Sequence, residues 1–150
     1  MKEITNVTIV STNLNRRLLE NYKDYYVIEN NFSYDELLQK KKVLFFNILN
    51  NLSDEKLHKL FEYLKDNNIL FINITNDIEL SLYTDYLMVY DDSKILIEGQ
   101  TLEVLKNEKL LKRIGLNLPF MVELSFLLKD YDLINEIHLN KESLVDELWK

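Results

Sequence analysis

Two apolar runs of the sequence each end in polar residues that could do chemistry. Val43-Leu44-Phe45-Phe46 is followed by Asn47, and the run 69–74 is followed by Thr75-Asn76-Asp77. An apolar run without polar alternation is typical of a strand covered on both faces, and a strand–helix–strand crossover makes two such strands parallel. In an open α/β sheet, ligands bind just beyond the carboxyl ends of the strands. Asn47 and residues 75–77 therefore mark the predicted site.

The start of the chain offers no loop that could hold a phosphate group. Such a loop needs glycine, because its successive backbone N–H groups converge on the anion through conformations that only glycine adopts cheaply. The first glycine of the sequence is Gly99, and residues 11–17 supply the guanidinium groups of Arg16 and Arg17 without a glycine beside them. We therefore expect residues 7–19 to hold no triphosphate.

Strands and helices alternate over the first 100 residues. Ser33 and Glu36 have the spacing of a capping box, and Ser53 is a good N-cap for the helix between the two apolar runs. Asp91-Asp92-Ser93, between two further apolar runs, is a hairpin signal. The pattern predicts strands at 7–10, 25–28, 43–46, 69–74, 86–90 and 94–97, and helices at 14–22, at 33–41, after Ser53 and, as a short one, after Asp77.

From Thr101 onward the pattern is helical. It predicts helices at 101–105 and 108–114, a helix opened by Pro119 that is apolar on nearly all sides, and a last amphipathic helix at 141–149. We therefore divide the chain into an α/β core, residues 1–100, and a C-terminal helical extension, residues 101–150. The predicted fold class is α/β, a mostly parallel sheet with a β-hairpin and a C-terminal helical appendage.

The composition limits the classes of function. The 150 residues carry a net charge of −7, which disfavours binding to nucleic acid or to an anionic membrane surface. Cysteine is absent, so thiolate ligands and disulfides are excluded. No apolar run approaches the length of a membrane span, and we predict a cytoplasmic protein. His58 and His138 have no partners at metal-ligand or triad spacing, and we interpret both as surface residues.

Five segments of the sequence together resemble a known family. They are the strand 43–48, the turn 50–53, the strand 72–77, the hairpin 84–99, and a tail made of residues 114–120, 122–124 and 144–149. These segments are similar to the Walker B strand, the D-loop, the switch strand, the following hairpin and the C-terminal extension of the ATP-binding subunit of energy-coupling-factor (ECF) transporters. ECF ATP-binding subunits are ABC ATPases, so the resemblance implies a sheet of the P-loop NTPase type.

The same resemblance assigns roles to positions at which this chain differs from the family. The Walker B aspartate, which holds magnesium, corresponds to Asn47, and the catalytic glutamate corresponds to Ile48. The D-loop aspartate corresponds to Ser53 and the switch histidine to Asn76, while Asp77 is retained. Asn47 offers magnesium a neutral amide in place of a carboxylate, and an isoleucine can neither orient nor deprotonate a water. Although ATP and Mg²⁺ are the cofactors of the family, we expect no bound cofactor or metal and no catalytic residue in this pseudo-ATPase.

The resemblance also implies partners, because the C-terminal extension is where ECF ATP-binding subunits pair. It implies an accessory or regulatory protein that forms a homodimer, or a heterodimer with an intact ECF-type ATPase, in the cytoplasm or at the inner face of the membrane beside a transporter complex. The interface residues that follow from it are Leu116, Pro119, Phe120, Val122, Leu124 and Trp149.

Two other hypotheses remain open at this point. Residues 40–47 and 52–55 are also similar to the DNA-end-binding ring protein of type II CRISPR adaptation modules, which looks like an inactivated relative of the same fold. A DNA-binding scaffold needs a basic concave surface, which the acidic composition disfavours. The second hypothesis is a decaying gene product without a selected role.

Overall fold

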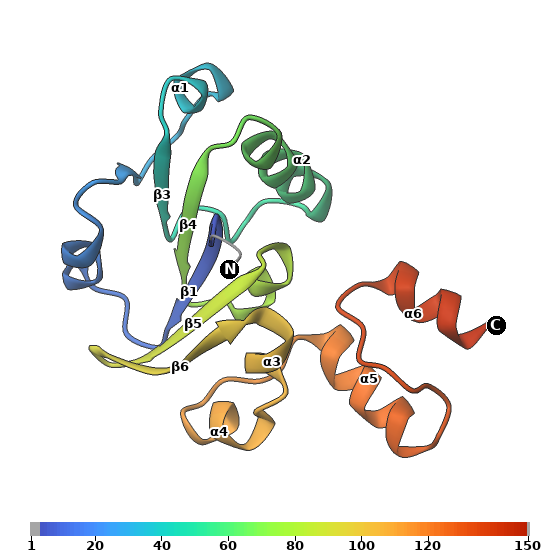
Figure 1. Ribbon diagram of the computed structural model, residues 1–150. Helices are drawn as coiled ribbons and strands as arrows, with labels where there is room; N and C mark the ends of the chain where they lie inside the picture. The colour runs from blue at the N-terminus through green and yellow to red at the C-terminus, as the bar shows by residue number, and fades with distance from the viewer. Residues whose placement is uncertain (1–3, 150) are drawn as a thin grey trace.

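Six strands form one sheet in a computed structural model that describes residues 4–149. The order is β2-β3-β4-β1-β5-β6 (Figure 1). All neighbouring strands are parallel except β6, which pairs antiparallel with β5. The predicted α/β class with a mostly parallel sheet and a hairpin is therefore confirmed. The strands are β1 (Asn6–Ser11), β2 (Tyr26–Ile28), β3 (Lys42–Phe46), β4 (Leu70–Thr75), β5 (Tyr86–Asp91) and β6 (Lys94–Gln100).

The helices lie where the pattern predicts them, with two differences in type. The segments after β1 and β4 are the 3-10 helices η1 (Arg16–Tyr22) and η2 (Ile78–Tyr83), and η1 begins late because the Asn15 side chain accepts a hydrogen bond from the backbone N–H of Arg17. The two predicted serine N-caps, Ser33 and Ser53, are confirmed. The α-helices are α1 (Tyr34–Leu38), α2 (Asp54–Asp66), α3 (Thr101–Leu105), α4 (Glu108–Arg113), α5 (Phe120–Asp130) and α6 (Lys141–Leu148).

Helices cover both faces of the sheet, α1 and α2 on one face and η1 on the other. On one face Val43, Phe45 and Phe71 pack against α1 and α2, which contribute Leu37, Leu57, Leu60, Phe61 and Leu64. On the other face Ile9, Leu44, Ile72 and Ile74 pack against Leu18 of η1. In Figure 1, α2 lies to one side of β3 and β4, and η1 lies on the other side. Burial on both faces explains why these strands carry continuous apolar runs.

The course of the chain defines a topological switch point between β1 and β4. From the carboxyl end of β1 the chain runs toward β2, whereas from the end of β4 it runs the other way, across β1 to β5. β1 and β4 are neighbours. Adjacent strands whose connections leave in opposite directions define the position at which open α/β sheets bind ligands. Thr75 ends one of these two strands, so the predicted site lies beside this switch point.

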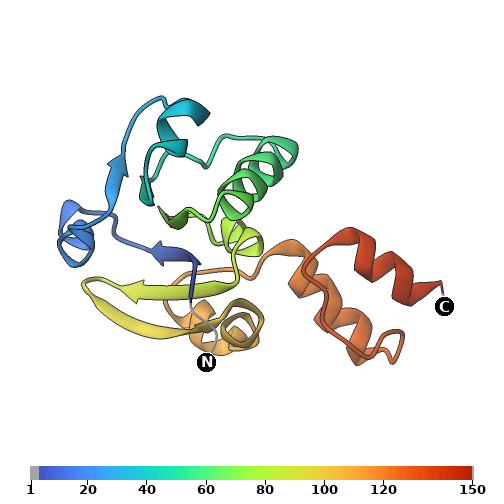
Figure 2. The same cartoon turned by 45° about the horizontal axis from the view of Figure 1, so that its top comes forward.

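The helices after the hairpin divide into two groups. Residues of α3 and α4 join the apolar cluster of the sheet, which includes Val10, Leu87 and Val89. α5 and α6 instead project from the body of the molecule (Figure 2), and we refer to residues 120–149 as the C-terminal arm. The arm is attached through Val122, which is buried in the same cluster, and through a hydrogen bond of 2.9 Å from the backbone N–H of Phe120 to Glu79 Oε1.

Asn73 is a polar residue in the middle of the sheet. Its side chain is fully buried, and neither its amide nitrogen nor its oxygen has a hydrogen-bond partner among the described residues. Its neighbours across the sheet are Thr8 on β1 and Phe45 on β3. Burial of an unpaired amide is costly, so Asn73 destabilises the strand that carries the predicted site.

None of the helices within residues 4–149 combines the length and the apolar character that crossing a bilayer requires.

Candidate functional site

The predicted site residues meet at the carboxyl ends of β3 and β4. The two strands are paired side by side, and the backbone N–H of Asn47 donates to the carbonyl oxygen of Ile74 over 2.8 Å. Asn47 has a φ of 54°, in the left-handed region that asparagine adopts more readily than most residues. This conformation turns the chain sharply at the end of β3 and leads it toward the end of β4.

Asn50 is the centre of a closed hydrogen-bond cluster at this edge. Its amide nitrogen donates to Asn47 Oδ1 over 3.1 Å and to Asn76 Oδ1 over 2.9 Å. Its own carbonyl oxygen accepts from Thr75 Oγ1 over 2.7 Å. We refer to these four residues, Asn47, Asn50, Thr75 and Asn76, as the asparagine cluster. Asn50 has both of its side-chain hydrogens and its oxygen engaged within the cluster, so little of its hydrogen-bonding capacity is left for a ligand.

Two of the three remaining site residues, Asp77 and Ser53, serve as helix caps. Asp77 Oδ1 accepts from the backbone N–H of Glu79 over 3.0 Å and so begins η2, and Ser53 Oγ accepts from Lys56 N over 3.2 Å at the start of α2. Capping satisfies backbone donors that a helix leaves unpaired at its first turn. Ile48, at the position that the resemblance gives to the catalytic glutamate, packs against the apolar cluster beneath α2.

The polar groups gathered in the cluster at the carboxyl ends of β3 and β4 are mainly neutral amides. Magnesium sites in nucleotide-binding proteins usually contain at least one carboxylate beside water and substrate phosphates, and activation of water needs a base or a positioning side chain. Within residues 4–149 no three histidine or carboxylate side chains gather as a metal site. The hollow beside the cluster has a volume of about 540 Å³, and it is lined by Glu29, Asn30, Asn31, Phe32, Asn47, Ile48, Asn50, Asn51 and Leu52.

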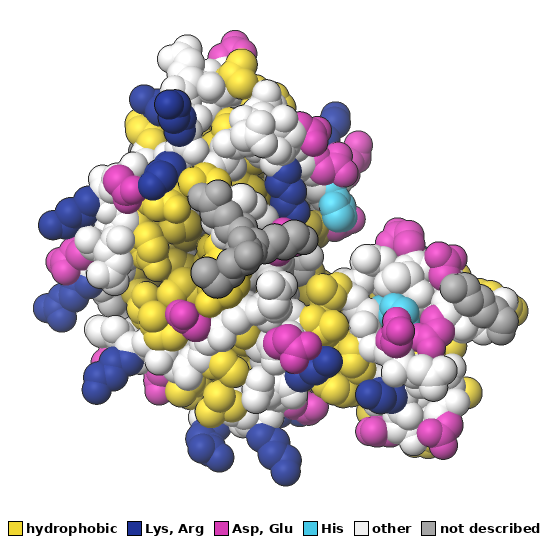
Figure 3. All heavy atoms as spheres, in the orientation of Figure 1, with side chains coloured by type: hydrophobic (Ala, Val, Ile, Leu, Met, Phe, Trp, Pro, Cys, Tyr) yellow, Lys and Arg dark blue, Asp and Glu magenta, His cyan; other side chains and the backbone are white. Residues whose placement is uncertain are grey.

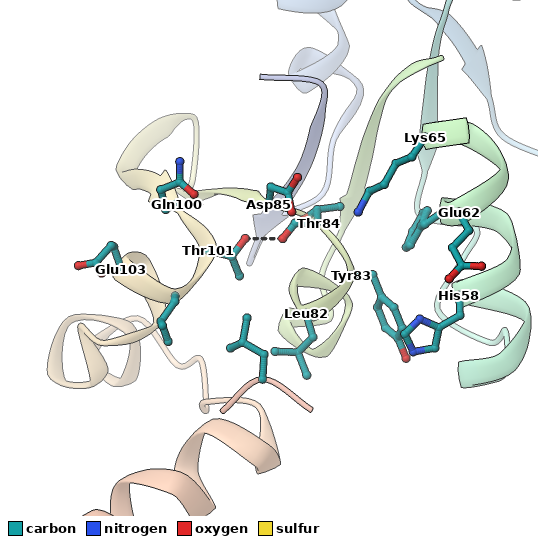
Figure 4. A pocket seen from close by; sticks show the side chains of 13 residues that line it. His58, Glu62, Lys65, Leu82, Tyr83, Thr84, Asp85, Gln100, Thr101 and Glu103 are labelled. Carbon is teal, nitrogen blue, oxygen red and sulfur yellow. Dashed lines mark hydrogen bonds between the residues drawn. The ribbon is translucent and has the colours of Figure 1, made fainter. Parts of the chain in front are cut away.

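A second hollow, of about 560 Å³, lies between α2, the turn before β5 and the start of α3 (Figure 4). Phe61, Leu82 and Leu102 contribute apolar surface, and charged side chains such as Lys65 stand around them. Two of its polar residues bond to each other: Thr101 Oγ1 donates to the carbonyl oxygen of Thr84 over 2.6 Å. This hollow lies toward the amino end of β5, away from the asparagine cluster, and we assign it no chemistry.

The interpretation of His138 as a surface residue is wrong. His138 is only 8% exposed, and both of its ring nitrogens are engaged: Nδ1 lies 3.0 Å from Ser143 Oγ, and Nε2 lies 2.5 Å from Glu147 Oε1. Its backbone N–H donates to Ser125 Oγ over 3.0 Å. His138 therefore ties α5, the connecting loop and α6 together. Sequence spacing hides this role, because the contacts depend on how the arm folds back. His58, in contrast, is exposed on α2 as predicted.

The hydrogen bonds around His138 favour the carboxylate form of Glu147. The backbone N–H of Asn135 donates to Glu147 Oε2 over 2.6 Å, and His138 contacts the other oxygen. These hydrogen bonds, that from Asn135 first, lower the pKa of Glu147 below its ordinary value. The arm thus has an internal polar anchor of its own.

The six residues of the expected interface divide by exposure. Leu116, Pro119 and Val122 are buried within this chain, and Leu124 is half-buried. Phe120 and Trp149 are 67% and 84% exposed. Only the last two present a large apolar surface to a partner in the structure as it stands.

Sequence reasoning missed Asn50 and Glu79, which connect the parts of the site. Three asparagines between positions 47 and 51 were a signal for local side-chain hydrogen bonding. No comparable signal identified Glu79, since its partner, the backbone of Phe120, lies 41 residues away.

Comparisons with known proteins agree with the resemblance. No family model matches the chain. An ECF transporter ATP-binding protein, EcfA1, of Lactobacillus delbrueckii is 39% identical over 88 residues, which are 57% of this chain and 31% of that protein. EcfA1 of Bacillus subtilis is 36% identical over 104 residues, 68% of this chain and 37% of the relative. A putative ABC transporter ATP-binding protein of Pyrococcus abyssi is 28% identical over 120 residues, 76% and 43% of the two chains.

Among solved structures, CbiO1 of Clostridium perfringens, described as part of an ABC transporter complex, aligns with a TM-score of 0.41 and 21% identity over 61% of this chain and 37% of that one. The sequence matches make the chain a relative of ABC transporter ATP-binding proteins. Within that class it is related to the ATP-binding proteins of ECF transporters. The chain spans about a third of the length of the two EcfA1 relatives, 31% and 37%.

Proposed function

We propose that this chain is a non-catalytic homologue of an ECF-type ATP-binding subunit and acts as an accessory or regulatory interaction protein. The asparagine cluster carries this proposal. Asn50 holds Asn47 and Asn76 together at the two positions that the resemblance gives to the magnesium ligand and the switch histidine. A cluster of amides bonded to one another supplies neither a ligand carboxylate nor a base for water.

The partner in this proposal is an intact ECF-type ATP-binding subunit, bound at the inner face of the membrane through the C-terminal arm. Two observations support it. The relatives of the chain are transporter ATP-binding proteins, and the arm exposes Phe120 and Trp149. Large aromatic side chains that protrude into solvent are typical anchors of protein–protein interfaces.

The hypothesis of a DNA-binding scaffold finds no support in the surface charges. Several basic side chains that such a scaffold would need for phosphate contacts are paired with carboxylates, as in Arg16–Glu29, Lys42–Asp24 and Lys112–Glu108. The net charge of −7 opposes the electrostatic attraction that drives most DNA binding.

The test measures pairing and ATP hydrolysis together. The tagged chain is mixed with a purified intact ECF-type ATP-binding subunit, and the complex is isolated by size-exclusion chromatography. We expect a complex that Trp149→Ser weakens by about ten-fold or more, as expected of an interface anchor, and no magnesium-dependent hydrolysis by the chain alone. Lys109→Ser, an exposed position outside the arm, is the matched control. Hydrolysis by the isolated chain, or the absence of any complex, would contradict the proposal.

A further inference from the structure

The C-terminal arm holds most of the exposed large apolar side chains of residues 4–149. Among the described residues twelve large apolar side chains are exposed, and seven of them lie in the arm, which is a fifth of the chain. Exposed apolar groups concentrated in one region indicate an interaction surface rather than ordinary scatter. The seven are Phe120, Leu127, Tyr131, Leu133, Val145, Leu148 and Trp149.

These side chains follow the period of the two helices. Phe120, Leu127 and Tyr131 are spaced by seven and four residues, so they lie along one side of α5, with half-buried Leu124 between them. Val122 and Ser125, at other positions of α5, are buried. On α6, Val145, Leu148 and Trp149 are exposed, while Leu144 is buried. Each helix therefore has one apolar side packed within the chain and a second that nothing in the described chain covers.

The same arm is strongly acidic. Residues 120–149 contain seven carboxylates and two lysines, which gives a net charge of −5 out of −7 for the whole chain. Asp130, Glu136 and Asp146 are exposed, and none of them forms an ion pair with another described residue. Several acidic side chains of the arm are visible on one face in Figure 3. The exposed apolar sides of α5 and α6, which we call the apolar strips, thus belong to a region of strongly negative net charge.

This charge decides what can cover the strips. Two copies of the chain meeting through their arms would bring two groups of net charge −5 together, and like charges facing each other across an interface oppose association. A surface of opposite charge is attracted instead and is selected over neutral or acidic competitors. We infer that the arm is a docking surface for a different protein, which presents an apolar patch bordered by lysine or arginine, and that it does not pair with a second copy of itself.

The inference rests on the proposed function only in taking the arm as an interface, and it can be tested without the natural partner. The probes are two synthetic amphipathic helical peptides of about 18 residues, or about five helical turns, one of leucine and lysine and one of leucine and glutamate. Binding is measured by fluorescence anisotropy at about 0.15 M salt, where charges within about 8 Å still interact. We expect the basic peptide to bind at least about ten-fold more tightly than the acidic one.

Two charge variants test whether the arm itself causes the preference for the basic peptide. Asp130→Lys, Glu136→Lys and Asp146→Lys together change the net charge of the arm from −5 to +1, and we expect the preference between the peptides to vanish or reverse. Glu20→Lys, Asp66→Lys and Asp91→Lys change the net charge of the chain by the same amount at three exposed carboxylates outside the arm, none of which forms an ion pair within residues 4–149. That control should keep the wild-type preference.

A further variant tests the apolar contribution of the arm to binding. Leu127→Ser replaces an exposed side chain, so it leaves folding intact and should weaken binding of the basic peptide by about five-fold or more, as for an apolar contact of the interface. Sedimentation of the wild-type chain alone should show a monomer at about 0.15 M salt. A stable homodimer, equal binding of both peptides, or an equal effect of the control triple variant would overturn the inference. If the peptides behave as expected and no ATP-binding subunit binds, the proposed function fails and this inference stands.

Discussion

The asparagine cluster and the C-terminal arm use their residues in opposite ways. In the cluster, the amide group of Asn50 is fully engaged with Asn47, Thr75 and Asn76. In the arm, apolar side chains that could be buried remain in solvent, as Tyr131 at 76% exposure shows. A side chain such as Asn50, whose donors and acceptor are already engaged, has little left for a ligand, whereas a region with uncovered apolar surface gains free energy when a partner covers it. The comparison places the capacity for interaction in the arm.

The two regions are connected by three consecutive steps through η2. Thr75 Oγ1 accepts from the backbone N–H of Asp77 over 3.0 Å, and the Asp77 side chain caps the backbone of Glu79. Glu79 in turn accepts the backbone N–H of Phe120 at the start of α5. These hydrogen bonds therefore connect the end of β4 to the start of the arm.

The largest expected effect concerns the anchor of the arm. His138→Ala removes both ring contacts and leaves Ser143 and Glu147 without their partner, so we expect a loss of about 2–3 kcal/mol in the stability of the arm. Hydrogen exchange should quicken in α5 and α6 and stay unchanged in β3 and β4. His58→Ala, on the exposed side of α2, should change stability by no more than about 0.5 kcal/mol. Faster exchange throughout the sheet would show that arm and core unfold as one unit.

The second-largest expected effect is an increase in stability. Asn73→Val removes a buried amide that has no partner among the described residues, so we expect the free energy of unfolding to rise by about 1–2 kcal/mol in urea titrations. Thr8→Val, on the neighbouring strand, is the matched control. Thr8 Oγ1 lies 2.7 Å from Thr84 Oγ1, and its replacement should destabilise by about 1 kcal/mol. Destabilisation by Asn73→Val would mean that the amide is satisfied in solution.

A smaller effect is expected at the connection between the two regions. Glu79→Ala leaves the first N–H of α5 without its acceptor, which should cost about 0.5–1 kcal/mol and quicken hydrogen exchange in the first turn of α5. Glu62→Ala, an exposed position on α2 with no ion pair among the described residues, should have no effect on α5. If exchange in α5 is the same in both variants, the connection does not position the arm.

The pH dependence of the arm should be modest and confined to acid. The pKa of Glu147 is lowered in the folded state, first by the Asn135 N–H and then by His138. A lowered folded pKa means that the stabilisation is complete above the unfolded value of about 4.3 and is lost as the pH falls through the folded value. Urea titrations between about pH 6 and pH 3 should show a steeper loss for the wild type than for Glu147→Gln. Glu142→Gln should retain the wild-type slope, and equal slopes for all three chains would contradict this account.

Much of the fold could be predicted from the sequence because its signals are local. The continuous apolar runs at 43–46 and 69–74 indicated strands covered on both faces, and both proved to be central in a parallel sheet. Ser33 and Ser53 cap their helices as their spacing indicated. Local signals did not separate 3-10 from α-helix in η1 and η2, since the apolar spacing of two short turns is similar in both.

The sequence predicted which residues meet at the carboxyl ends of β3 and β4, but it did not predict the hydrogen bonds between them. That Asn47 and residues 75–77 meet followed from the parallel pairing of β3 and β4. The role of Asn50 as the centre, and the buried position of His138, depend on contacts between segments whose approach the sequence pattern does not specify. For the same reason Leu116 and Val122 were expected at an interface and are instead buried against the sheet.

Calorimetric titration with ATP, in the presence and in the absence of Mg²⁺, tests whether the cluster of amides at the end of the sheet takes up a magnesium nucleotide. We predict no saturable heat up to about 1 mM ATP under either condition, which corresponds to binding weaker than about 4 kcal/mol. Saturable, magnesium-dependent binding with a Kd in the micromolar range would contradict the account.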